Sequence, residues 1–113
     1  MKIISDTIPF EDIQVMAANR FGDFVKAVVD VEKRIMAVDA ELHADEEALL
    51  LDNGSTQQNL WGINLYPELE TSEWIEFDSM INVRPSQGNR SRSVENPEIQ
   101  RTITSIVTNL VKR

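Results

Sequence analysis

The sequence contains no cysteine, and no apolar run in it is longer than four residues. The first absence excludes disulfides, cysteine-ligated zinc or iron–sulfur sites and thiol catalysis. The second excludes a transmembrane helix, which needs about 20 apolar residues. The opening residues are too weakly apolar for a signal peptide, which predicts a cytoplasmic location. Because there is a single histidine, a multi-histidine metal site is excluded as well.

Positive charge is scarce over most of the chain. The 113 residues carry 11 basic and 19 acidic side chains, a net charge of −8. Residues 1–83 hold 5 basic and 17 acidic side chains, whereas residues 84–113 hold 6 basic and 2 acidic side chains. A body this acidic repels polyanions, so nucleic acid is not an expected partner. A small anion can still contact the basic segment, because salt screens distant charges over about 10 Å.

A first helix is predicted close to the beginning of the chain. Pro9 suits a first helical position, and apolar residues follow it at helical spacing. Gly22 is placed to end the helix, since glycine readily adopts the left-handed conformation found there. These signals predict a helix over 9–21.

A second helix is predicted over 97–112. Asn96 suits the N-cap and Pro97 the first helical position. Exposing the apolar stripe of this helix would cost several kcal/mol at about 25 cal/mol per Å², so the stripe must dock on an apolar surface. The stripe consists of Ile99, Ile103, Ile106, Val107, Leu110 and Val111.

The remaining segments indicate a mostly antiparallel sheet. Strands are predicted at 2–5, 25–31, 34–44, 60–66 and 73–83. A short apolar run over 48–52 is closed by Asn53-Gly54, a strong turn signal, and residues 55–59 are expected to form a loop or one helical turn. The expected fold is α+β, with five or six strands and two helices packed on one face. We expect residues 1–113 to form a single domain.

Successive strand residues point to opposite faces, so one face of this sheet is apolar and the other polar. The polar face is predicted to carry Asp39, Glu41, His43 and Asp45 from one strand, Asn64 and Tyr66 from another, and Glu76, Asp78, Asn82 and Arg84 from a third. Lysine is absent from these rows, although solvated faces are usually rich in it. Either this face is simply solvated, as in many antiparallel sheets, or it forms a site. Facing carboxylates favour a site, because they cost free energy unless a cation neutralises them.

The lone histidine lies within an acidic motif. Glu41, His43 and Asp45 would lie along one strand edge, about 6.6 Å apart. Such donors suit Mg²⁺, Mn²⁺ or Zn²⁺ if a neighbouring strand contributes, because alternate strand positions cannot all reach one ion. We therefore expect Glu41, Asp45 and Glu76 as metal ligands, and His43 and Asp78 as catalytic groups. The alternative is a surface histidine paired with a carboxylate.

The segment 84–92 is rich in arginine and in small polar residues. Its guanidinium and backbone N–H groups suit an anion, although it lacks the Gly-Lys-Ser/Thr of a Walker loop. The predicted ligand-binding residues are Arg84, Arg90 and Arg92 of this segment, with Asn64 and Asn82 of the polar face. The alternative is a mobile loop whose arginines neutralise the acidic sheet face.

Three strings of the sequence resemble a family of small uncharacterised prokaryotic proteins grouped as a domain of unknown function. They are Glu-Leu-His-Ala-Asp-Glu-Glu (41–47), Leu-Trp-Gly-Ile-Asn (60–64) and Glu-Phe-Asp-Ser-Met-Ile-Asn-Val-Arg-Pro-Ser-Gln-Gly-Asn-Arg-Ser-Arg (76–92). The resemblance covers most of the chain. It implies a free-standing prokaryotic cytosolic protein and brings no known activity, cofactor or catalytic residue.

The sequence favours a site for a small anionic, phosphate-containing ligand, with or without a divalent metal, and hydrolysis of a phosphoester is the reaction that it suggests. This hypothesis requires His43, Asp78 and Arg84 to emerge on the same side of one sheet. The alternative is a non-enzymatic protein-interaction module or a homodimer, which an exposed apolar patch would favour. No membrane association is expected.

Overall fold

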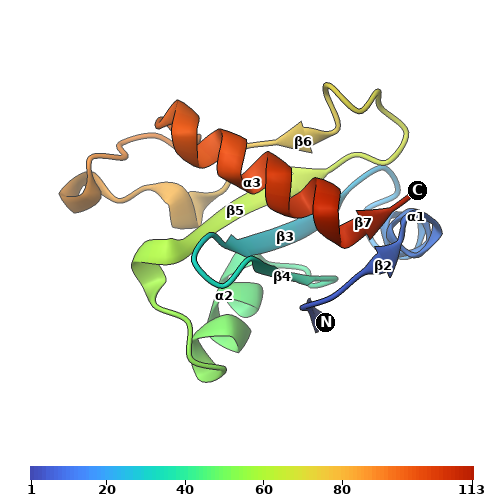
Figure 1. The fold of residues 1–113 in the computed structure, drawn as a ribbon, viewed down its shortest axis with the longest axis horizontal. Coiled ribbons are helices and arrows are strands. Elements are labelled where there is room, and N and C mark those ends of the chain that lie inside the picture. Colours follow the sequence, from blue (N-terminus) through green and yellow to red (C-terminus); the bar gives the residue numbers. More distant parts are fainter.

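The computed structural model describes residues 1–113 and is built around a five-stranded sheet (Figure 1). The strands are β1 (Lys2–Ile4), β3 (Val25–Asp30), β4 (Ile35–Val38), β5 (Leu60–Leu65) and β6 (Ile75–Glu76). Their order is β1-β4-β3-β5-β6, and every neighbouring pair is antiparallel. The expected α+β class is therefore confirmed. A separate parallel pair, β2 (Ile8–Pro9) with β7 (Val111–Lys112), joins the two ends of the chain.

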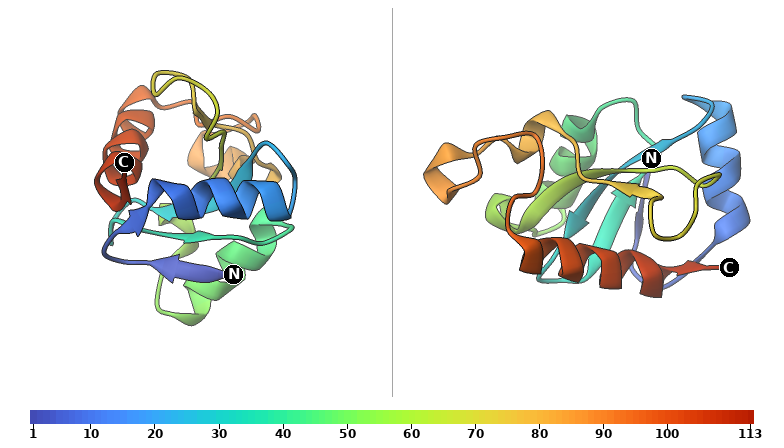
Figure 2. Two further views of the ribbon diagram at one scale, coloured as in Figure 1. Left: turned by 90° about the vertical axis from the view of Figure 1, so that its right-hand side faces the viewer. Right: turned by 90° about the horizontal axis from the view of Figure 1, so that it is seen from above.

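Three helices accompany the sheet, and two of them were predicted. The helices are α1 (Phe10–Asn19), α2 (His43–Asp52) and α3 (Pro97–Leu110). Figure 2 shows α3 lying along one face of the sheet and α1 standing at its end. The buried residues of α1 and α3 share one core with the strands. None of the three helices is long and apolar enough to cross a bilayer.

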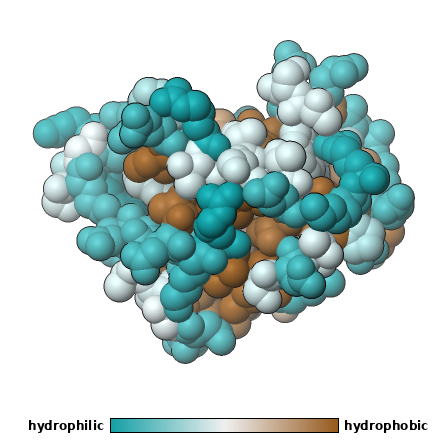
Figure 3. All heavy atoms as spheres, viewed as in Figure 1, coloured by the Kyte–Doolittle hydropathy of each residue, from teal (hydrophilic) through white to brown (hydrophobic).

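The ends of α3 and α1 follow the sequence signals. The Asn96 side chain accepts a hydrogen bond from the Glu98 N–H at 2.8 Å, and Pro97 begins α3. Figure 3 shows mostly hydrophilic and neutral residues on the outer side of the molecule along this helix, with hydrophobic residues visible beside them. After α1, Gly22 has φ +97° and donates to the Ala17 carbonyl at 2.7 Å, which ends the helix as predicted.

The prediction of a strand over 34–44 is wrong beyond Val38. The strand stops at Asp39, whose φ of +70° turns the chain out of the sheet, and α2 begins at His43. The segment after the break is rich in alanine, glutamate and leucine, which are strong helix formers. It also places acidic residues in the first turn, where the helix dipole stabilises them. The apolar run over 48–52 belongs to this helix.

Helix α2 covers the sheet face that was expected to be polar. Leu50 of α2 packs on Val28, Ala37 and Leu60 in a second, smaller core. The short 3₁₀ helix η1 (Gln57–Asn59) follows, as the single turn expected over 55–59. The sheet is therefore apolar on both faces over much of its area. Its polar residues include Lys26, Asn64 and Glu76 at the end near His43, and the buried Asp30 at the other end of β3.

The prediction of a strand over 73–83 is also wrong beyond Glu76. The chain leaves the sheet there and forms the 3₁₀ helices η2 (Met80–Asn82) and η3 (Pro85–Gln87). The Asn82 side chain takes the place of the missing strand. Its carbonyl accepts from the Gly62 N–H at 2.8 Å, and its amide donates to the Gly62 carbonyl at 2.9 Å. These bonds satisfy the edge of β5 and hold η2 against it.

The close approach of η2 to β5 requires glycine at position 62. A Cβ added there would lie 2.5 Å from the Ser79 Cβ and 2.6 Å from its Oγ. We expect Gly62→Ala to lower the free energy of unfolding by about 1–3 kcal/mol, measured by urea denaturation. Ser79→Gly removes both clashing atoms, so the double variant should lose less stability than the two single variants together. Strict additivity would contradict this packing.

Candidate functional site

A small cavity lies between the start of α2 and the segment that follows β6. Its volume is about 190 Å³. It is lined by Lys26, Leu42, His43, Ala44, Ser79, Met80, Ile81 and Arg92. We call it the His43 pocket. It joins β3, α2 and the 78–92 segment, which are distant in the sequence.

His43 is the first residue of α2, and its ring is oriented by the sheet. Its Nε2 lies 2.8 Å from the Ile63 carbonyl oxygen. A carbonyl oxygen only accepts, so Nε2 carries the hydrogen and donates it. Nδ1 makes no hydrogen bond within the chain. The residue is only 9% exposed. His43 therefore presents one unpartnered ring nitrogen to the pocket.

Burial lowers the pKa of His43 below its usual 6.5. The bond to Ile63 opposes this shift, while Lys26 adds to it because a nearby cation disfavours the imidazolium form. The ring is therefore neutral at neutral pH, and Nδ1 carries a lone pair. An anion bound beside the ring would reverse the balance and favour the charged form.

Two cationic side chains line the pocket, and both keep donors free. Lys26 forms no ion pair in the structure, and its Nζ lies 5.2 Å from the centre of the Phe21 ring. Arg92 uses only Nε, which donates to Asp78 Oδ1 at 2.6 Å. Its two terminal nitrogens make no hydrogen bond. The pocket can therefore offer an anion both an ammonium and the end of a guanidinium.

The backbone of Arg92 is fixed in place beside His43. Its carbonyl accepts from the Ser79 N–H at 3.0 Å and from the Asn82 side-chain amide at 3.0 Å. Asn82 is itself bound to Gly62 of β5. The sheet thus positions the base of Arg92, while its side chain remains 55% exposed and able to contact a ligand.

Asn64 and Glu76 lie close to the pocket but outside it. The Asn64 amide donates to Glu76 Oε1 at 2.8 Å and to the Asp78 carbonyl at 3.2 Å. Asn64 stands opposite Lys26 in the pairing of β3 with β5. Its buried Oδ1 has no hydrogen-bond partner. Of the predicted site residues, the structure thus brings together His43, Asn64, Glu76, Asp78 and Arg92.

Arg84 and Asn82 are not placed to bind a ligand. Arg84 is buried over the Trp61 ring and donates to the carbonyls of Ile81, Gln57 and Leu60. Asn82 is wholly buried and bonded through both side-chain atoms. Both residues attach the 78–92 segment to β5. The expectation that Arg84 would emerge beside His43 is therefore corrected.

Arg90 is exposed on the same segment but outside the pocket. Its N–H and that of Ser91 donate to the Glu95 carboxylate at 2.9 and 2.8 Å. A hydrogen bond from the Ser91 side chain, followed in importance by those from the Ser91 and Arg90 N–H groups, lowers the pKa of the Glu95 carboxyl below its usual value. This contact shapes the tip of the loop and leaves the Arg90 side chain in solvent.

The three expected metal ligands are not gathered together. Glu41 pairs with Arg20 at 3.6 Å, and Asp45 lines the same separate cavity as Glu41, which His43 does not reach. Glu76 lies on β6 and is bound by Asn64. No group of three or more His, Cys, Asp or Glu side chains is close enough to hold a metal ion. The expected arrangement depended on a strand over 41–45, where the structure has the start of a helix.

Glu46 is a buried acid, one helical turn from His43, that the strand prediction missed. It lies one helical turn after His43 on the inner face of α2 and is fully buried. Its Oε2 accepts from the Ala40 N–H at 3.1 Å, and its Oε1 has no partner. Burial raises its pKa to about 9, so it is protonated at neutral pH. A helical interpretation of 43–52 would have placed His43 and Glu46 together.

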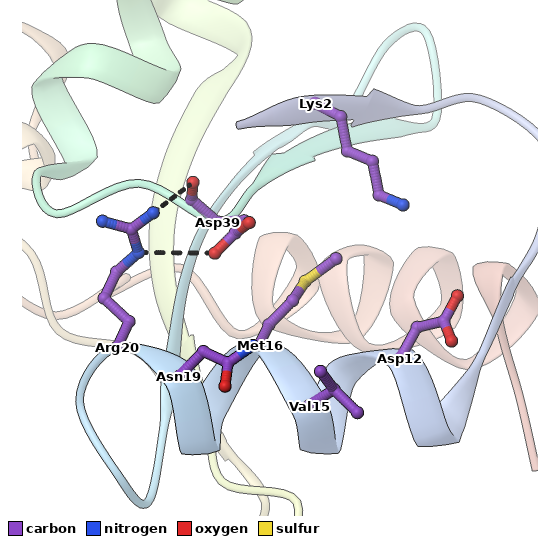
Figure 4. Close-up of a pocket in the computed structure, with 7 residues that line it drawn as sticks. All are labelled: Lys2, Asp12, Val15, Met16, Asn19, Arg20 and Asp39. Atoms are coloured by element: carbon purple, nitrogen blue, oxygen red, sulfur yellow. Dashed lines mark hydrogen bonds and ion pairs between the residues drawn. The ribbon is translucent and has the colours of Figure 1, made fainter.

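A larger cavity of about 460 Å³ lies between β1 and α1 (Figure 4). Lys2 from the strand and Asp12 and Met16 from the helix point toward this space. Arg20 closes one end by binding the Asp39 carboxylate at 3.3 Å. Because its guanidinium also pairs with Glu41, this cavity offers an anion less uncompensated charge than the His43 pocket does.

Comparison with known proteins identifies the family. A family model described as "Protein of unknown function (DUF5674)" matches residues 2–110. The chain belongs to this family. No curated protein and no solved structure matches it. The resemblance noted in the sequence is thereby confirmed as membership of a family of uncharacterised proteins, and the function must be argued from the site.

The surroundings of His43 should determine both the pKa and the tautomer of its ring. We expect a ring pKa below 6.5 and the Nε2–H tautomer at neutral pH, because burial disfavours the imidazolium and Ile63 accepts from Nε2. Two-dimensional ¹H–¹⁵N NMR of the ring nitrogens measures both. A pKa at or above 6.5, or the Nδ1–H tautomer, would contradict the structure.

The buried carboxyl group of Glu46 should make the free energy of unfolding depend on pH. Above pH 4.5 the unfolded chain has lost this proton while the folded chain keeps it up to about pH 9. Stability must therefore fall as pH rises across this window, by about 1.4 kcal/mol per pH unit. His43 acts in the opposite direction, but only below pH 6.5. Between pH 6.5 and 9, we expect Glu46→Gln to flatten the decline in urea midpoint.

The matched control for this experiment is Asp45→Asn, on the exposed side of the same helical turn. It should keep the pH dependence of the unmodified protein. If Glu46→Gln and Asp45→Asn change the slope equally, the buried carboxyl is not its source.

Proposed function

We propose that this protein binds a small phosphate-bearing anion in the His43 pocket. One observation carries the proposal. Lys26 and the terminal nitrogens of Arg92 approach the same cavity without a hydrogen bond or ion pair to the protein, beside His43, whose Nδ1 can take up a proton when an anion binds. Free cationic donors at a partly buried position favour an anion, because charge-assisted hydrogen bonds are about twice as strong as neutral ones.

The start of α2 adds to this arrangement. Leu42 occupies the N-cap and provides no side-chain hydrogen bond to the first turn. The N–H groups of His43 and Ala44 therefore have no partner, and both residues line the pocket. The positive end of the helix dipole and two open N–H groups would complement the cations.

Phosphoester hydrolysis would place a further requirement on the same residues. Phosphoester hydrolysis would need His43 Nδ1 to take a proton from the attacking water while Arg92 and Lys26 stabilise the phosphoryl charge. The pocket holds one such base, and no metal-binding cluster accompanies it. The second candidate is an interaction module, favoured by Leu42 and Met80, which are 55% and 65% exposed at the pocket.

The proposal is tested by titrating the ¹⁵N-labelled protein with inorganic phosphate. We expect shifts at the amides of His43, Ala44 and Arg92. Arg92→Gln and Lys26→Gln should each weaken binding about tenfold, because each removes a charge-assisted bond. At a fixed charge of the ligand, binding should tighten as pH falls through the pKa of His43, since the protonated ring adds a positive charge.

The control is Arg90→Gln, which removes the same charge from the same segment outside the pocket. It should change affinity by less than a factor of about three, the effect of an exposed charge. If Arg90→Gln weakens binding as much as Arg92→Gln, the anion is held by general electrostatics and the proposal fails. Release of 4-nitrophenol from its phosphate ester tests hydrolysis separately.

A further inference from the structure

We infer that the anion carries an apolar group, so that the physiological ligand is a small amphiphilic phosphate rather than inorganic phosphate. This inference rests on the proposed function and specifies its ligand class. It depends on the juxtaposition of two long exposed apolar side chains, Leu42 and Met80, with the two cations Lys26 and Arg92 in one pocket.

Leu42 occupies a position where a polar residue is normally preferred. Helix N-caps are usually Ser, Thr, Asp or Asn, and an apolar residue there lowers stability by about 1 kcal/mol. Leu42 lies at the N-cap of α2, forms no cap bond, and leaves more than half of its surface in water. Neither local helix stability nor core packing explains a leucine at this point, whereas contact with an apolar ligand group does.

Met80 is held outward by a well-fixed turn. The Ser79 Oγ accepts from the Ile81 N–H, and Asn82 anchors the same turn to Gly62. The backbone under Met80 is thus fixed to the sheet while its side chain is the most exposed large apolar group of the chain. Methionine adapts its shape to different apolar partners, which suits a wall of a binding site.

The size of the pocket separates the head group from the rest of the ligand. Pockets that enclose a whole drug-sized ligand have about 300–1,000 Å³. At about 190 Å³, the His43 pocket can enclose only a head group. A group attached to that head group would extend out of the pocket, where the side chains of Leu42 and Met80 are exposed to solvent. The cations select the phosphate, and these side chains select an alkyl or aryl substituent.

A free small molecule is favoured over a membrane surface. The chain carries a net charge of −8, which repels an anionic bilayer as a whole, whereas a single phosphate experiences mainly the nearby cations. Vesicles containing phosphatidic acid should therefore bind less tightly than a soluble monoalkyl phosphate with the same head group.

The test compares methyl phosphate with hexyl phosphate in NMR titrations of the full chain. Each methylene that becomes buried should increase affinity about fourfold, so hexyl phosphate should bind at least tenfold more tightly than methyl phosphate. Met80→Gln and Leu42→Ala should each remove a large part of this gain, measured as the ratio of the hexyl phosphate affinity to the methyl phosphate affinity of the same variant. Both side chains are exposed, so the variants keep the fold.

The matched control is Val15→Ala, which trims an exposed apolar residue of α1 outside the pocket and should preserve the full gain. Equal affinities for methyl and hexyl phosphate would overturn the inference and leave the proposed function intact. A gain that survives in both variants, or tighter binding to vesicles than to hexyl phosphate, would also overturn it. Failure of every phosphate to bind would instead reject the proposed function.

Discussion

The contact between the Asn82 side chain and Gly62 determines the arrangement of this site. Strand β5 would otherwise expose an unpaired edge where β6 ends, and Asn82 satisfies both backbone groups there. The same amide also binds the Arg92 carbonyl. A single buried side chain therefore ends the sheet, attaches the 78–92 segment and sets the position of Arg92. The absence of a Cβ at Gly62 makes the approach possible.

Helix α2 completes the site from the other side. Its packing through Leu50 fixes the helix on the sheet, and its first turn then places His43 over Ile63 and Glu46 over the interior. One helical surface thereby carries an apolar anchor, a buried acid and an oriented imidazole. The chemistry of the pocket depends on this helical spacing, because residues three and four apart share a face.

The sequence was sufficient to locate helices and strands where a local signal marks their ends. Asn96-Pro97 and Gly22 marked helix ends correctly, and strand-forming runs bounded by turn signals located β3, β5 and the beginning of β4. The sequence was insufficient at Asp39, a residue other than glycine whose left-handed backbone conformation ends β4. An alternating pattern continued through that break and concealed α2. Nor could it foretell that Asn82 and Arg84 would bind backbone atoms, because those partners lie about 20 residues away in the chain.

A cationic pocket persists in this acidic chain because no carboxylate lines it. Glu46 lies near Lys26, yet burial keeps it protonated, so it does not neutralise the ammonium. Asp78 engages only the Nε side of Arg92. The other carboxylates act mainly through the long-range field, which salt screens over about 10 Å. That field opposes a polyanion that spans the surface, while a small anion at the pocket experiences mostly Lys26 and Arg92. The charge distribution of the protein therefore selects ligands by their size as well as by the sign of their charge.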